Sequence, residues 1–119
     1  MVEHVREHSL IGQPDHGRIR PLKRAEIYRV LDRMTEGLPK AGRILLVPPD
    51  ITRLYSYAGV ITSYLYKKLS VDALVRILPA TGTHRPMTPR ERCLLFGRDI
   101  PDHAFLIHDW RRDTVDIGT

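Results

Sequence analysis

Three apolar segments spaced about 30 residues apart constrain the fold of this chain more than any other feature, because that spacing is the length of a strand–helix–strand unit. They are residues 43–47, 73–78 and 104–107. Runs that are nearly continuous in apolar residues are typical of parallel strands whose two faces are both covered by helices. The pattern predicts an α/β fold, with a Rossmann-like parallel sheet of about three to four strands and flanking helices.

Helical patterns surround these segments. Apolar residues recur at i, i+3, i+4 and i+7 within residues 22–34, which predicts a first helix. Residues 56–69 carry a second apolar flank, with Ser56 as the expected N-cap. The clearest local signal is a Thr-Pro-Arg-Glu capping box, which predicts a third helix over residues 89–96.

The chain divides into an arm and a domain. Residues 1–20 hold glycines and prolines among polar residues, which predicts an irregular N-terminal arm. Residues 21–119 are expected to form a single α/β domain, since a 119-residue chain has the size of one ordinary domain. Residues 114–117 alternate between apolar and polar and indicate a short edge strand or a hairpin. So small a sheet leaves its edges uncovered, and we expect more chain or a second copy to cover them.

The composition is that of a soluble globular protein. Hydrophobic residues make up 42% and charged residues 28% of the chain, and no apolar run approaches the ~20 residues that cross a bilayer. The single cysteine, Cys93, excludes an internal disulfide framework, and its apolar helical context predicts a buried side chain. We therefore predict a cytoplasmic protein without a membrane partner.

The net charge of +5 suits nucleic acid, lipid or an anionic small molecule as a partner. The basic residues are scattered among acidic ones, and they do not alternate with aromatic residues that would stack on bases. We therefore expect no nucleic-acid partner. A basic nucleic-acid-binding domain is one alternative function. In that case the chain would bind nucleic acid with an affinity that falls steeply as the salt concentration rises.

Polar, chemically capable residues follow each apolar segment. Asp50 and Arg53 come after the first, His84 after the second and His108 after the third. In an open parallel sheet the residues beyond the carboxyl ends of the strands collect in one crevice, where such folds bind ligands. We therefore expect these four residues to be neighbours.

His84 is the best candidate for a general acid or base, since an unperturbed imidazole has a pKa of about 6.5. A histidine that only hydrogen-bonds its own turn is an equally good account. Arg53 offers a planar fork matched to carboxylate or phosphate, and Asp50 is placed to orient either that arginine or a substrate hydroxyl. The alternative is a solvated Asp–Arg pair that contributes little.

Thr81, Gly82 and Thr83 form a predicted turn that precedes His84. A positive φ at Gly82 would bring backbone N–H groups close to an anion or cofactor, and the two hydroxyls add donors. Turn formation alone explains the same residues. The chain lacks the three-glycine dinucleotide fingerprint and the phosphate-binding loop, and no His or Cys spacing predicts a complete metal site.

Two motifs carry a resemblance to a known family. The Asp-Ile-Thr-Arg motif at residues 50–53 and the Thr-Gly-Thr-His-Arg-Pro motif at residues 81–86 resemble those of the N-terminal domain of the nickel-pincer-dependent lactate racemase family. Residues 108–110 and 116–119 are also similar to that family, so the resemblance covers roughly residues 43–119. Full-length members are longer and have a second domain, which implies that this chain is an incomplete part of a larger two-domain fold.

The resemblance implies racemisation or epimerisation of a small 2-hydroxy acid by hydride transfer to and from a nickel pincer nucleotide. His84 matches a base that deprotonates the 2-hydroxyl, Arg53 the residue that grips the substrate carboxylate, and Asp50 the acidic residue beside it. The members act on lactate, sugar acids and other hydroxy acids. We further predict that the cofactor is bound by Thr52, Thr81, Gly82 and Thr83, and His108 is a further candidate for the site.

The nickel ligands, the tethering lysine and the second base match no residue of this chain, because they belong to the part of the family sequence that follows. The resemblance therefore implies that the chain needs the missing C-terminal domain or a second chain, and that by itself it is inactive and does not retain nickel. The alternative function is a non-catalytic anion- or nucleotide-binding module derived from the same family.

Overall fold

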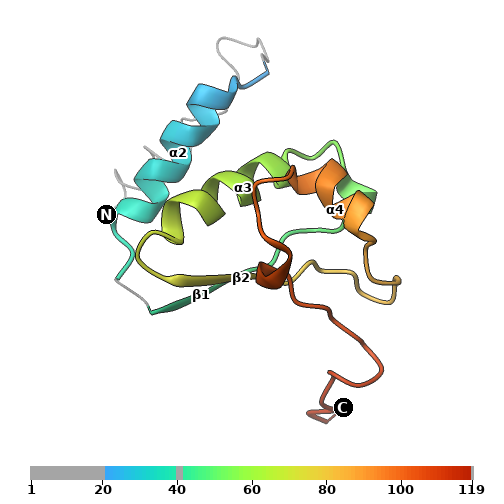
Figure 1. Ribbon diagram of the computed structural model, residues 1–119. Helices are drawn as coiled ribbons and strands as arrows, with labels where there is room; N and C mark the ends of the chain where they lie inside the picture. Colours follow the sequence, from blue (N-terminus) through green and yellow to red (C-terminus); the bar gives the residue numbers. More distant parts are fainter. Residues whose placement is uncertain (1–20, 40–41, 119) are drawn as a thin grey trace. The chain divides into compact units, whose positions relative to one another are not determined.

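The computed structural model describes residues 21–39 and 42–118, and the predicted arm at residues 1–20 lies outside them (Figure 1). The chain divides into two structural units, one that ends at Pro39 and one that follows it.

The first unit contains the helix α2 (Arg24–Glu36), which confirms the helix predicted over residues 22–34. Ile27 and Leu31 are its buried residues, and their spacing of four places them on one face. The carboxylate of Glu26 accepts a hydrogen bond of 3.2 Å from the backbone N–H of Lys23, which satisfies one of the free donors at the N-terminus.

The second unit is built on a strand–helix–strand motif. The strands β1 (Arg43–Leu46) and β2 (Leu74–Ile77) are parallel and hydrogen-bonded, and α3 (Ala58–Leu69) connects them (Figure 1). The first two strands and the helix between them are thus confirmed. In the register Arg43 lies opposite Leu74, and Leu46 lies opposite Ile77.

The helix α4 (Pro89–Phe96) begins at the predicted residue because of its capping box. The backbone N–H of Glu91 donates to the Thr88 hydroxyl at 3.2 Å, and the backbone N–H of Thr88 donates to the Glu91 carboxylate at 2.9 Å. Arg85 donates two further hydrogen bonds to that carboxylate, of 2.9 and 3.2 Å. This network ties the loop after β2 to the start of α4.

The core lies between one face of the sheet and the helices α3 and α4, which lie on the same side of it in Figure 1. Ile77 is fully buried and packs with Leu95 and Phe96 of α4. Gly59 of α3 sits so close to α4 that a Cβ atom there would lie 1.6 Å from the carbonyl oxygen of Leu95. Only glycine permits this approach of the two helices.

The sheet is smaller than predicted, with two parallel strands in the described part of the chain. The expected third strand over residues 104–107 is wrong. Asp102–Ala104 instead forms the 3₁₀ turn η2, and the segment touches the sheet through a single bridge between Phe105 and Ile77, with Leu106 N–H donating to Ile77 C=O at 2.7 Å. The turn uses up the start of the apolar run, so too few residues stay extended to form a ladder.

Three smaller predictions are also wrong. Residues 114–117 form no strand, because nothing in the described chain pairs with them, and Val115 and Ile117 are exposed. Tyr57 rather than Ser56 is the N-cap of α3, in a left-handed conformation with φ 64°, while the Ser56 hydroxyl accepts from Ala58 N–H at 3.3 Å. Cys93 is exposed, because it lies on the face of α4 that points away from the core.

Candidate functional site

The pairing of the two strands continues past their ends and sets up the site. Ala80 N–H donates to the carbonyl of Pro48 at 2.7 Å, and Pro49 bridges Ala80 in the parallel sense. The register is therefore the same as within the sheet, and the next residues along, Asp50 and Thr81, emerge side by side at the carboxyl end. Parallel sheets bind ligands at this end.

A tight turn then brings His84 back toward Asp50. His84 N–H donates to the carbonyl of Thr81 at 2.9 Å, and Gly82 within the turn has φ +59°, as the sequence predicted. The left-handed conformation suits glycine, which has no Cβ to clash. As a result His84 Nδ1 lies 2.8 Å from Asp50 Oδ2.

Asp50 is only 4% exposed, and both of its carboxylate oxygens accept hydrogen bonds. The backbone N–H of Thr52 donates to Asp50 Oδ1 at 3.1 Å, the Thr52 hydroxyl donates to the same oxygen, and His84 occupies Oδ2. Burial by itself raises the pKa of the Asp50 carboxyl, but the hydrogen bonds from Thr52 and His84 outweigh it and lower the pKa below 3.8. Asp50 is therefore a carboxylate at neutral pH.

The charge of Asp50 decides the tautomer of His84. A carboxylate only accepts hydrogen bonds, so Nδ1 of His84 must carry a proton and donate it. The other ring nitrogen, Nε2, then holds a free lone pair when the ring is neutral. The His84 side chain is 58% exposed, and the described residues offer Nε2 no hydrogen-bond partner. The imidazole is thus fixed at one nitrogen and open at the other.

Arg53 ends the short 3₁₀ helix η1 (Ile51–Arg53), whose N-cap is Asp50. Its backbone N–H donates to the Asp50 carbonyl at 3.0 Å, and its side chain is exposed. None of the described carboxylates pairs with its guanidinium. The solvated Asp50–Arg53 pair, given above as the alternative, is absent from this part of the chain, and the two carboxylate oxygens bind Thr52 and His84 instead. The fork of Arg53 remains available to an anion.

Thr52, a predicted cofactor-binding residue, also makes a contact that was not predicted from the sequence. Its backbone N–H and its hydroxyl both donate to the Asp50 carboxylate. The Asp-x-Thr spacing was the available signal, because an aspartate commonly accepts from the backbone two residues later. The structure therefore gives Thr52 a role in positioning the carboxylate.

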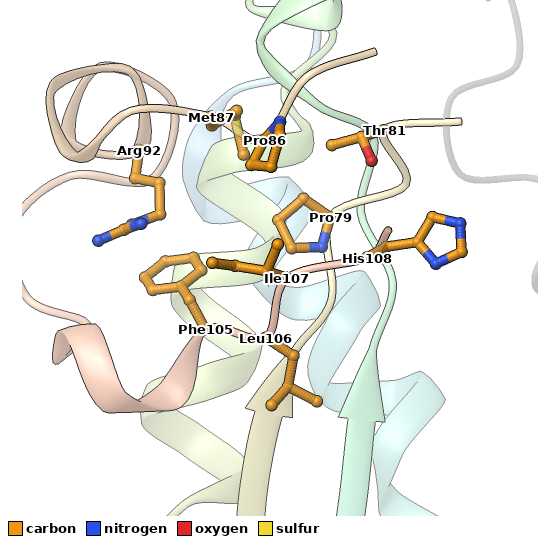
Figure 2. Close-up of a pocket in the computed structure, with 9 residues that line it drawn as sticks. All are labelled: Pro79, Thr81, Pro86, Met87, Arg92, Phe105, Leu106, Ile107 and His108. Carbon is orange, nitrogen blue, oxygen red and sulfur yellow. The ribbon is translucent and has the colours of Figure 1, made fainter. Parts of the chain in front are cut away.

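Thr81 and His108 line a small hollow, which Figure 2 shows beside Pro79 and Met87. Thr81 is 4% exposed, and its hydroxyl has no hydrogen-bond partner among the described residues. The hollow has a volume of about 20 Å³, enough for one water-sized group. A buried polar atom without a partner is costly, so this hydroxyl suits a polar group of a ligand or a water.

The four expected neighbours are thus brought together in part. Asp50 contacts His84 directly and Arg53 through the backbone. His108 instead lies 4.0 Å from Asp113, and no described contact joins it to His84. Thr83 and Gly82 are exposed on the turn.

The described residues do not fit a metal ion by themselves. Within residues 21–39 and 42–118 no three His, Cys, Asp or Glu side chains gather closely enough to hold one. Holding nickel would require ligands from outside this part of the chain.

Within residues 21–39 and 42–118 no helix is long and apolar enough to span a bilayer.

Comparison with known proteins agrees with the motif resemblance. Residues 11–119 match the family model described as the lactate racemase N-terminal domain. The fold is similar to a crystal structure of a protein from Thermotoga maritima, with 29% sequence identity and a TM-score of 0.61 over 74% of this chain. The chain spans 21% of the length of that solved chain. A search of curated proteins gives no match.

Proposed function

The chain belongs to the lactate racemase N-terminal domain family, and on that premise we propose that it supplies one wall of the active-site cleft of a 2-hydroxy acid racemase or epimerase. In this proposal His84 is the base that takes the proton of the substrate's 2-hydroxyl. The whole activity belongs to a larger assembly, in keeping with the 21% of the solved chain that is matched. The rest of the cleft comes from polypeptide outside this sequence.

The observation that carries the proposal is the 2.8 Å contact between His84 Nδ1 and the buried carboxylate of Asp50. A general base needs a fixed orientation and an open nitrogen, and this pair provides both. Asp50 also stabilises the imidazolium that forms when Nε2 takes a proton, since the ring then carries a positive charge beside a negative one.

Arg53 is the proposed anchor for the substrate carboxylate. Its guanidinium is exposed and has no carboxylate partner among the described residues, while its backbone is bonded to that of Asp50. A planar guanidinium binds a carboxylate through two parallel hydrogen bonds, which fixes orientation as well as position. The 2-hydroxyl, one carbon away from that carboxylate, would then be directed toward the base.

The cofactor implied by the family is a nickel pincer nucleotide, and the chain fits it in part. The unpartnered Thr81 hydroxyl suits one polar group of an organic ligand, but the hollow beside it holds no more than a water-sized group, and the nickel would need other ligands. When bound, such a cofactor supplies a hydride acceptor and donor for the substrate's C2 carbon. Proton transfer and substrate orientation are the tasks that this chain's own residues would perform.

A second candidate function is a non-catalytic anion- or nucleotide-binding module. It is favoured by the buried Thr81 hydroxyl, which has no partner among the described residues, and by the left-handed Gly82 beside it, since turns of this kind can direct backbone N–H groups toward an anion. This reading predicts that the chain binds phosphate or a mononucleotide, and that binding survives His84→Ala but is lost in Thr81→Val. Binding measured by calorimetry on the two variants separates it from the catalytic reading.

The test of the catalytic proposal is turnover in the full-length protein that contains this domain, with its cofactor loaded. His84→Ala should lower turnover by ~10² or more, the usual contribution of a general base. Arg53→Lys should raise KM, because a point charge cannot replace the bidentate fork. His103→Ala is the matched control, since His103 is exposed in η2 and should leave turnover unchanged. Near-normal turnover in His84→Ala would refute the proposed role.

A further inference from the structure

One face of the two-stranded sheet is left open. Because paired residues of a parallel ladder point to the same side, Leu46 and Ile77 share the face that packs into the core with α3 and α4. The opposite face carries Arg43, Leu45, Leu74 and Arg76, and within the second unit neither α3 nor α4 covers it (Figure 1). Parallel sheets are almost always covered on both faces.

Together with Leu106, these four residues form a surface that we call the open face. Leu45 is 51%, Leu74 47% and Leu106 42% exposed, and together with both arginines they line a hollow of about 320 Å³. Contiguous apolar patches that are bordered by polar residues often mark interaction sites on protein surfaces. None of these residues belongs to the Asp50–His84 pair.

The charge of the open face indicates what covers it. Arg43 and Arg76 lie at diagonal positions across the ladder, and no described carboxylate pairs with either of them. A second copy of the chain would bring four guanidinium groups and no carboxylate into one interface, which is unfavourable. The complement is therefore an apolar stripe flanked by Asp or Glu.

We propose that the open face is the docking surface for an acidic amphipathic helix from polypeptide outside this sequence. Leucine-sized side chains of that helix would cover Leu45, Leu74 and Leu106, and its carboxylates would pair with the two arginines. The length of the related solved chain, of which the match spans 21%, leaves ample polypeptide to supply it. Such a helix would give the sheet the second layer that a parallel sheet requires.

The test uses the 119-residue chain and a synthetic helical peptide of about 20 residues, with leucines on one face and flanking glutamates. Titration followed by ¹⁵N NMR should shift backbone amides of β1 and β2. Arg43→Glu/Arg76→Glu should weaken binding at least about tenfold, whereas Arg90→Glu/Arg98→Glu, which changes the same charge on exposed residues elsewhere, should leave it within about twofold. A peptide with lysines in place of the glutamates should not bind.

Three results would overturn the proposal. The first is no binding of the acidic peptide at millimolar concentration, or amide shifts confined to residues outside the open face. The second is a dimer of the chain, detected by light scattering, that Leu45→Asp dissociates. The third is tighter binding to phosphatidylglycerol vesicles than to the acidic peptide, lost in the Arg43→Glu/Arg76→Glu variant. Should that variant fail to fold, the amide shifts in the wild-type chain decide the question.

Discussion

Asp50 and His84 stand 34 positions apart in the chain, yet Oδ2 of one lies 2.8 Å from Nδ1 of the other. The parallel register places Asp50 beside Thr81. The turn at Gly82 then reverses the chain, so that the imidazole of His84, three residues after Thr81, reaches Asp50. Local backbone geometry at the sheet edge thus produces a pair with the features of an oriented base.

The first prediction concerns the tautomer of His84. At neutral pH, ¹⁵N NMR of the chain should show the neutral ring protonated at Nδ1 and unprotonated at Nε2, because an ionised Asp50 accepts only a donor. Asp50→Asn should give a mixture of the two tautomers, since an amide both donates and accepts. His84 with Nε2 protonated in the wild-type chain would contradict this assignment.

The second prediction follows from the pKa of Asp50, which is lower in the folded chain than its ordinary value of 3.8. A carboxyl with a lowered pKa adds stability above the unfolded value and loses it as pH falls through the folded one. The difference in unfolding free energy between wild type and Asp50→Asn should therefore shrink as the pH falls below 3.8. Urea titrations at acidic pH measure it, and a difference that widens below pH 3.8 would contradict the prediction.

The third prediction tests the approach of α3 to α4. Gly59→Ala would place a Cβ 1.6 Å from Leu95 C=O, so the helices must move apart, and we expect a loss of about 1–3 kcal/mol or more in unfolding free energy. Gly42→Ala is the control, because nothing lies within 4 Å of a Cβ there. If the two variants were equally stable in urea, the close approach of α3 to α4 at Gly59 would be refuted.

The fourth prediction uses the unpartnered hydroxyl of Thr81. Thr81→Val keeps the shape of the side chain and removes a buried polar atom, so the chain without ligand should gain about 1 kcal/mol. Thr81→Ser, which keeps the hydroxyl, should show no such gain. If Thr81→Val is less stable than wild type, an ordered water or another partner satisfies the hydroxyl.

The sequence predicts much of the fold because its strongest signals are local. The capping box at Thr88 and the apolar spacing within α2 depend only on neighbouring residues, and both helices form as expected. The run at residues 104–107 looked equally strand-like, but a strand needs a partner along several residues, and only Phe105 pairs. Periodicity does not report whether a partner is there.

The sequence predicts the location of the candidate site better than its contacts. Strand ends pointed to Asp50, Arg53 and His84, and the family motifs point to the same residues. The bond between Asp50 and His84 depends on the register of the sheet, which sets Pro49 opposite Ala80, and no residue pattern specifies that register. The contact between Thr52 and the carboxylate is local, because the two residues are two positions apart, and no described carboxylate pairs with Arg53.

The most direct test of the central claim is a double-mutant cycle on turnover in the full-length, cofactor-loaded protein that contains this domain. If Asp50 acts only through His84, Asp50→Asn should slow the wild type but not slow His84→Ala further, so the double variant should match His84→Ala within about twofold. Losses that multiply in the double variant would contradict the account, because Asp50 would then act independently of the imidazole.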